Sequence, residues 1–374
     1  MANIIDKVKS IFVPSKKFDT EFARRFADKC RHSKEFLDFL TASTNGDISK
    51  LQSLAIIEDS LKTGPCKHDR DLPFDEKKWT ELVKNFFAKC MPQKAEEAKQ
   101  ILDKTHPYFI DENGNSHVQF IQVPKDDRRS SSVGQNGSNM HLNFDIYIHG
   151  SLDDLRTTAH ETAHALSSHH QHLIQLIRSG ASKKEIEDYT RFKADAQSVG
   201  EIESHIVEAL FNQYLLSNNI YTQEDMQNYE QGARNSLQHD INVVRQESDI
   251  IRDLNGDMSE KSLNKLYTHY MRTGKKQLAS RIEKIVSESN SSYMFRYVVG
   301  RVVADRWIDK FNNSTKTEKE QMLTTFQNYL DHTHEMTVDK ACQTLLGANF
   351  VSLAQDYAKS QQNQIQTENI ASKN

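Results

Sequence analysis

Apolar and polar residues alternate with two different periods along this chain of 374 residues. In residues 140–150, apolar and polar side chains take alternate positions, which is the pattern of a half-buried strand. Residues 117–124 alternate in the same way. In residues 198–216, apolar residues instead recur three and four positions apart, which predicts an amphipathic helix.

Most of the remaining chain favours helices. Long segments contain Lys, Glu, Gln and Leu, and the whole chain has only 13 Gly and 6 Pro. This composition predicts a mainly α-helical fold with a small antiparallel β-sheet. We expect a helical N-terminal lobe at residues 1–104, a main domain at 105–358 and a disordered polar tail at 359–374.

The segment between the second strand and the amphipathic helix contains an HExxH motif, formed by His160, Glu161 and His164. Positions four apart on a helix lie on one face, so both histidines can bind one metal ion. Zinc with two imidazoles, a third protein ligand and one open position makes water nucleophilic near neutral pH. We therefore expect Zn²⁺ as the cofactor, with Glu161 close enough to accept a proton from that water.

Two residues are candidates for the third zinc ligand. His170 lies ten positions after His160, as in the metzincin motif HExxHxxGxxH, but Ser167 stands where that motif has a helix-breaking glycine. If the helix continues past Ser167, His170 turns away from the site. Glu201 belongs to a second predicted helix, and a glutamate ligand from a second helix is the gluzincin plan. We favour Glu201 and keep His170 open, with His205 as a minor option.

Several polar residues of the second helix share one face with Glu201. Ser204, His205 and Glu208 follow it by three, four and seven positions. We expect Glu208 and Ser204 to support the metal ligands through hydrogen bonds. A solvated acidic face is the alternative interpretation of these residues.

These motifs together resemble the M3 family of zinc peptidases, the group of oligoendopeptidase F and thimet oligopeptidase. The resemblance covers roughly residues 105–358. Three segments carry it: LNFDIYIHGSLDDLRTTAHETAH (142–164), EIESHIVEALFNQYLL (201–216) and YMFRYVVG (293–300). They match the family's strand with its TLxHExGH helix, its ExxSxxxE segment and its YxYxYxxG segment. The resemblance implies a gluzincin (zincin-like) catalytic domain of M3 type that hydrolyses peptide bonds.

The sequence departs from the family pattern at some positions. Ala163 replaces the glycine before the second histidine. The family also has a His and a Tyr shortly before its aromatic segment, where they bind substrate and stabilise an oxyanion, whereas residues 281–292 contain neither. Tyr293 and Tyr297 are the candidates for that catalytic role. The N-terminal part is much shorter than in the family, so we expect a more open cleft.

The function expected from these features is that of a zinc-dependent metalloendopeptidase acting on peptides or extended protein segments. Zinc polarises the scissile carbonyl and a water, and Glu161 takes the water proton and delivers it to the leaving amine. The substrate backbone pairs with the strand at 140–148, which makes Asn143, Phe144 and Asp145 candidate substrate-binding residues. The alternative is a metallopeptidase-like protein that acts by binding, as an interaction module or a weakly active effector.

Composition restricts the partners of the chain. A net charge of −4 argues against nucleic acid as the main partner. The sequence lacks a run of eighteen apolar residues, so we expect no membrane span. Residues 1–14 form an amphipathic stripe without the apolar core of a signal peptide, and the four cysteines form no CxxC pair. Together these features favour a cytoplasmic protein, with delivery into another cell without a Sec signal as an alternative.

Overall fold

The computed structural model describes residues 17–43, 47–67, 69–135, 140–190 and 198–371. The amphipathic segment predicted at residues 1–14 lies outside the described residues. The elements in chain order are α2 (Thr20–Lys29), α3 (Ser33–Thr41), α4 (Lys50–Ser60), α5 (Glu76–Cys90), η1 (Pro92–Lys94), α6 (Ala95–Leu102), η2 (Pro107–Phe109), β1 (Val118–Gln122), β2 (Ser132–Gln135), β3 (Leu142–Ile148), α7 (Leu152–Leu166), α8 (Ser168–Arg178), α9 (Lys183–Thr190), α11 (Ile202–Ser217), α12 (Gln223–Leu254), α13 (Glu260–Arg272), α14 (Lys276–Lys284), α15 (Ser291–Asn313), α16 (Lys316–Leu330), η3 (Thr333–Glu335), α17 (Val338–Leu346) and α18 (Phe350–Ala371).

The three strands form one mixed sheet with the order β1-β3-β2. β2 is the antiparallel hairpin partner of β3 and places Val133 opposite Phe144. β1 lies on the other side of β3, runs parallel to it and places Val118 opposite Phe144. The prediction of an antiparallel sheet is therefore wrong for one of its two strand pairs. Because β2 occupies one side of β3, β1 pairs with the other side, and there it runs parallel to β3.

The alternating pattern of β3 is confirmed by its burial. Its apolar side chains are buried in the core, while the residues between them are half-buried: Leu142, Phe144, Ile146 and Ile148 against Asn143, Asp145 and Tyr147. The turn after β3 is built around Asp154, whose carboxylate accepts the backbone N–H groups of His149, Gly150 and Ser151. These bonds close a capping box at Ser151 and fix the start of α7 directly behind the strand.

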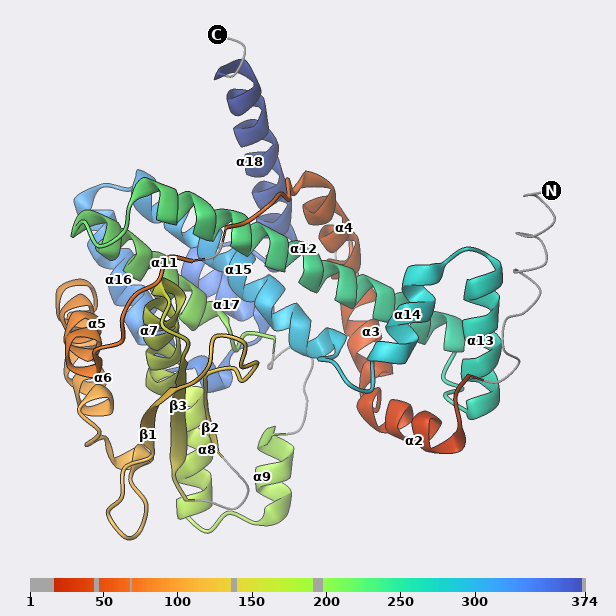
Figure 1. Ribbon diagram of the computed structural model, residues 1–374, viewed down its shortest axis with the longest axis horizontal. Coiled ribbons are helices and arrows are strands. Elements are labelled where there is room, and N and C mark those ends of the chain that lie inside the picture. The colour runs from red at the N-terminus through yellow and green to blue at the C-terminus, as the bar shows by residue number, and fades with distance from the viewer. Residues whose placement is uncertain (1–16, 44–46, 68, 136–139, 191–197, 372–374) are drawn as a thin grey trace.

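Three helices surround the site region and pack closely on one another. α11 contacts α7 on one side and α15 on the other, and α12 lies across α15. Figure 1 shows α5 and α6 beside the sheet and α7, while the long helix α12 crosses the molecule from the sheet end to the opposite end. The mainly helical fold predicted from the sequence is confirmed.

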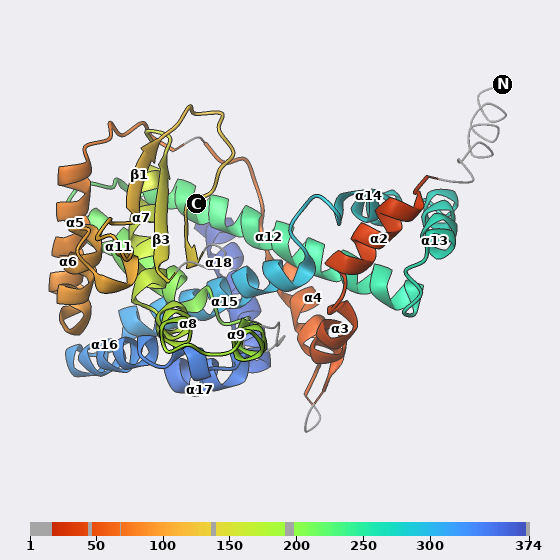
Figure 2. The ribbon, with the colours of Figure 1, turned by 90° about the horizontal axis from the view of Figure 1, so that it is seen from below.

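A second, smaller lobe stands at the far end of α12. It is formed by α2, α13, α14 and the last turns of α12 (Figure 2). Its own hydrophobic cluster includes Phe26, Ile250, Tyr270 and Ile282 and is separate from the main core. The division of the chain at residue 104 stays a prediction.

A buried ion pair joins this lobe to the main body. Arg281 of α14 lies against Glu247 of α12, and both side chains are almost fully buried. The other carboxylate oxygen of Glu247 accepts the backbone N–H of Ser291, the first residue of α15, at 2.6 Å. α12, α14 and α15 are thereby held at one point. None of the helices in the described part of the chain has the length and apolar character needed to cross a membrane.

Candidate metal centre and active site

Two helices place the candidate ligands. His160, Glu161 and His164 lie within α7, as the four-residue spacing of the histidines predicts. Glu201 is the N-cap residue of α11, one position before the first helical residue. The histidines and Glu201 form a group whose donor atoms all lie within 4.8 Å of one another. The sequence-based pairing of these three residues is therefore reproduced in space.

The distances inside the group fit a tetrahedral zinc ion. One carboxylate oxygen of Glu201, Oε2, lies 3.4 Å from Nε2 of His160 and 3.2 Å from Nε2 of His164. Donors that surround zinc tetrahedrally at about 2.0–2.1 Å are about 3.3 Å from one another. The donor set of two imidazoles and one carboxylate is also one that zinc prefers.

The second nitrogen of each histidine faces another carboxylate. Nδ1 of His160 lies 3.3 Å from Glu208, and Nδ1 of His164 lies 3.4 Å from Glu203. Carboxylates in this position orient a ligand imidazole and direct Nε2 toward the metal. The hydroxyl of Ser204 donates to Oε2 of Glu201 at 3.2 Å. The supporting positions predicted for Glu208 and Ser204 agree with these contacts.

Burial and charge couple the protonation of the histidines and carboxylates in this group. Burial lowers the pKa of His160, but hydrogen bonds to the carboxylates of Glu201 and Glu208 outweigh it and raise the pKa to about 9. Burial opposes ionisation of Glu201 and Glu208, yet the neighbouring histidines hold the pKa of both carboxyls well below its usual range. A buried cluster of carboxylates and imidazoles is stable only when positive charge balances it.

Glu161 faces a cavity of about 410 Å³ beside the candidate ligands. Burial raises the pKa of Glu161, against the opposing effect of His164 and His160. The wall of the cavity includes ligand, aromatic and charged side chains: His160, His205, Glu208, Tyr147, Tyr297, Arg129, Asp240 and Arg301. A buried carboxyl with a raised pKa at the wall of a cavity is suited to accept a proton near neutral pH.

The two candidate tyrosines occupy different positions. Tyr297 lines the cavity, and its ring lies 6.2 Å from the ring of His205. Tyr293 is one helical turn earlier on α15, 39% exposed, with its hydroxyl 2.9 Å from that of Tyr297. Burial raises the pKa of Tyr297, so its hydroxyl stays protonated and can donate a hydrogen bond into the cavity. Of the two candidates, Tyr297 is thus the one that lines the cavity of Glu161, and Tyr293 contacts it from outside.

Gly300 allows α15 to lie directly against the ligand helix. A Cβ atom at this position would stand 2.6 Å from the backbone oxygen of Glu201 and 2.6 Å from Cδ2 of His205. Real Cβ atoms do not approach other atoms this closely, so any other residue would push α15 away from α11. The glycine that ends the aromatic segment therefore has a steric reason to be there.

The expectation that α7 continues past Ser167 is wrong. α7 ends at Leu166, and Ser167 has the extended backbone angles φ −74° and ψ 131°. Its hydroxyl bonds to Thr333 at 2.6 Å, a residue far away in the sequence. His170 therefore comes back toward the site, with its ring 6.1 Å from that of His164. In the described residues two groups of donors could hold a metal ion, His160 with His164 and Glu201, and His160 with His205 and Glu208. His170 belongs to neither group.

The expectation of a free edge on the strand at 140–148 is also wrong. β3 is the central strand, so both of its sides are paired, and Phe144 is fully buried in the core. Asn143 and Asp145 are half-buried in the pairing region with β2. β2 is an edge strand of the sheet and lies in contact with α7. β2, which pairs antiparallel with β3, is a short segment containing Ser and Gly in which no strand was predicted.

Other residues of the site were not expected from the sequence. Glu203 was missed because its contact with His164 depends on how α11 crosses α7. Asp240 and Arg301 reach the cavity from α12 and α15. Burial raises the pKa of Asp240 to about 7, with Arg301 acting in the opposite direction. No short motif marks either residue, since each reaches the site only through the packing of distant helices.

Two solved structures resemble the fold. A crystal structure assigned as a peptidase from Chlamydophila abortus is 14% identical, covers 94% of this chain and 56% of its own, and has a TM-score of 0.47. A crystal structure assigned as oligoendopeptidase F from Bacillus anthracis str. Ames is 12% identical, covers 97% of this chain and 58% of its own, and has a TM-score of 0.50. No protein-family model and no curated protein matches the chain.

The second of these likenesses defines the fold class. It confirms the mainly helical, M3-type fold expected from the sequence, with a sheet that is mixed rather than antiparallel. The chain spans less than two thirds of the length of either solved structure, at 56% and 58%.

The contact at Gly300 gives a first testable prediction. Gly300→Ala should lower the free energy of unfolding by about 1–3 kcal/mol, because the added methyl group overpacks the contact between α15 and α11. Urea unfolding followed by circular dichroism measures this change. Gly232→Ala in α12 is the matched control, since its Cβ would lie 3.4 Å from the Cys66 side chain, so it should be neutral or slightly stabilising. Equal stability of the two variants would contradict the steric role of Gly300.

Proposed function

We propose that this protein is a zinc-dependent metalloendopeptidase that hydrolyses peptide bonds in peptides or extended protein segments. The observation that carries the proposal is the convergence of His160, His164 and Glu201 on one point, with Glu161 facing the cavity beside it. The two structures of similar fold, assigned as a peptidase and as oligoendopeptidase F, add support from outside the chain.

The residues divide the chemistry between them. When bound by His160, His164 and Glu201, zinc supplies a Lewis acid that activates water and polarises a carbonyl group. Glu161 takes a proton from the attacking water and then gives it to the leaving amine. The hydroxyl of Tyr297 donates a hydrogen bond to the oxygen that gains negative charge in the transition state.

The substrate is placed by the cavity wall and by β2. Since both sides of β3 are paired, we assign the pairing with a peptide backbone to the outer side of β2, which contacts α7. The backbone N–H of Val133 in β2 points at the carboxylate of Glu161 and lowers its pKa. A peptide added along β2 would thus bring its own backbone next to the general base.

The metal assignment predicts zinc in the purified protein. The wild-type chain should hold about one zinc ion per molecule, and His160→Ala or His164→Ala should empty the site, because two ligands retain zinc poorly against chelators. Elemental analysis after dialysis measures the content. Wild-type protein that stays free of zinc after incubation with excess metal would rule out the proposal.

A set of ligand variants separates the gluzincin plan from the metzincin plan. Glu201→Ala should lower zinc affinity strongly, and His170→Ala should leave it nearly unchanged. Glu208→Ala should weaken binding by about ten- to a hundredfold, as expected for a carboxylate that orients a ligand. Competition with a chromophoric chelator gives the three affinities. If His170→Ala has the large effect and Glu201→Ala the small one, the site is of the metzincin type.

The role of Glu161 as the general base is tested by replacing its carboxylate with an amide group. Glu161→Gln keeps the size of the side chain but cannot accept a proton, so it should retain zinc and fold while losing nearly all hydrolysis. The measurement is the turnover of a fluorogenic peptide library, with zinc content as the control for an intact site. Wild-type activity in this variant would show that another group is the base. A wild type that binds peptides but cuts none would favour the binding-protein alternative.

The shape of the cleft predicts which substrates can enter. We propose that the cleft beside Glu161 is open, so it should admit a long unfolded chain as well as short peptides. Digestion of a denatured protein and of matched short peptides, analysed by mass spectrometry beside the Glu161→Gln variant, measures this. Cleavage confined to short peptides would contradict the open cleft and leave the peptidase assignment in place.

A further inference from the structure

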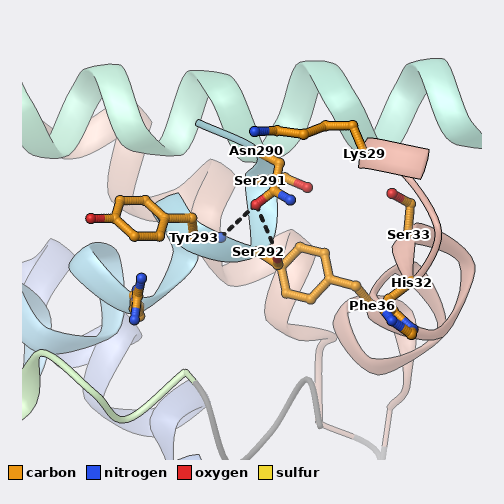
Figure 3. A pocket seen from close by; sticks show the side chains of 9 residues that line it. Lys29, His32, Ser33, Phe36, Asn290, Ser291, Ser292 and Tyr293 are labelled. Atoms are coloured by element: carbon orange, nitrogen blue, oxygen red, sulfur yellow. Dashed lines mark hydrogen bonds between the residues drawn. The ribbon is translucent and has the colours of Figure 1, made fainter. Parts of the chain in front are cut away.

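A second cavity lies where the corner between α2 and α3 faces the start of α15. Its volume is about 230 Å³. Figure 3 shows Lys29, His32, Ser33 and Phe36 on one side and the first residues of α15 on the other. The lining from α15 consists of Asn290, Ser291, Ser292, Tyr293 and Arg296.

The charged side chains that line this cavity are cationic. Lys29 and Arg296 contribute cationic groups, and the nine described residues that line it include no aspartate or glutamate. Ser33 adds a hydroxyl and Asn290 an amide NH₂ group able to donate hydrogen bonds, while the hydroxyl of Ser292 donates to Oδ1 of Asn290 at 2.9 Å. A small cavity with this lining selects an anionic group.

The two cations are not balanced by carboxylates of the chain. Within the described residues, neither Lys29 nor Arg296 takes part in an ion pair, in contrast to Arg24 and Lys34 nearby, which pair with acidic residues on their own helices. The guanidinium of Arg296 instead lies over the ring of Tyr293, with Cζ 4.0 Å from its centroid, and its Nε is buried without a hydrogen-bond partner. A buried donor without a partner is costly unless a ligand satisfies it.

The cavity is connected with the active site through α15. Tyr293 belongs to its wall, and the hydroxyl of Tyr293 lies 2.9 Å from that of Tyr297, which lines the cavity of Glu161. Residues four apart on a helix are separated by about one turn of 5.4 Å, and an extended peptide advances about 3.3 Å per residue. A peptide lying along these two tyrosines would reach the cationic cavity within a few residues of the bond that is cut.

We propose that the cavity between Lys29 and Arg296 is a subsite that binds a carboxylate of the peptide substrate, a few residues from the scissile bond. This inference rests on the proposed peptidase function and adds a substrate preference to it. The guanidinium of Arg296 and the ammonium of Lys29 pair with the carboxylate, and the hydroxyl of Ser33 and the amide NH₂ of Asn290 complete its hydrogen bonds. The carboxylate is either the free C-terminus of the peptide or an acidic side chain.

The test uses one randomised peptide library prepared in three forms. The first has a free C-terminal carboxylate, the second a C-terminal amide, and the third an amide with one added glutamate. The wild type should cut the first or the third form about tenfold faster than the second, measured as kcat/KM, because a hydrogen bond to a charged group strengthens binding by about that factor. The form that is preferred identifies the source of the carboxylate.

Variants of Lys29 connect the preference with the cavity. Lys29→Gln should remove most of the preference, and a circular dichroism spectrum that matches the wild type shows that the variant folds. Lys29→Glu should reverse the preference, so that peptides carrying a lysine are cut faster than peptides carrying a carboxylate. Lys34→Gln is the matched control, because Lys34 is an exposed lysine of α3 that pairs with Asp38 outside the cavity.

Binding separates failure of this inference from failure of the proposed function. The three peptide forms are labelled, and their affinity for the Glu161→Gln variant is measured by fluorescence anisotropy. Equal affinity for all three forms, or a preference that survives Lys29→Gln, would overturn the subsite. A preference in binding that depends on Lys29, together with a wild type that cuts none of the peptides, would uphold the subsite and overturn the peptidase assignment.

Discussion

The arrangement of the site depends on one buried carboxylate. Glu201 is 4% exposed and has an imidazole nitrogen of α7 on either side of its Oε2 atom. A carboxylate removed from water is tolerated only with positive charge or hydrogen-bond donors around it. The N-terminus of α11 must therefore stay against the HExxH face of α7. The other contacts of the site serve to keep these two helices together.

Small residues lie near this contact in α7 and in α15. Ala159 and Ala163 of α7 are fully buried next to the ligand histidines. On the other side, Gly300 lets α15 touch the backbone of Glu201 itself. Because larger side chains would separate the helices, the position of the carboxylate is fixed by backbone packing rather than by its own flexible chain. Such packing holds ligand atoms at the spacing a metal requires.

Local patterns predicted the local parts of this structure. The spacing of His160 and His164 and the alternation in β3 each depend on neighbours within a few residues, so the sequence alone identified them. The break after α7 could not be predicted in this way, since Ser167 is held by Thr333 from a distant segment. The prediction of antiparallel pairing failed for β1 for a similar reason, because the pattern of β3 is the same whichever strand lies beside it. Glu203 and Asp240 reach the site through helix packing that no short motif records.

Helix α15 connects the candidate metal centre with the proposed substrate site. Its first residue donates to Glu247, which also holds Arg281, so the start of the helix is fixed to α12 and α14. Its middle is fixed by the contact of Gly300 with Glu201. Between these points lie Tyr297 at the cavity of Glu161 and Arg296 at the cationic cavity. Since a helix is stiff over two turns, a shift that moved Arg296 would also move Gly300 against the ligand carboxylate. Helix α15 therefore links the lobe formed by α2, α13 and α14 to the candidate active site.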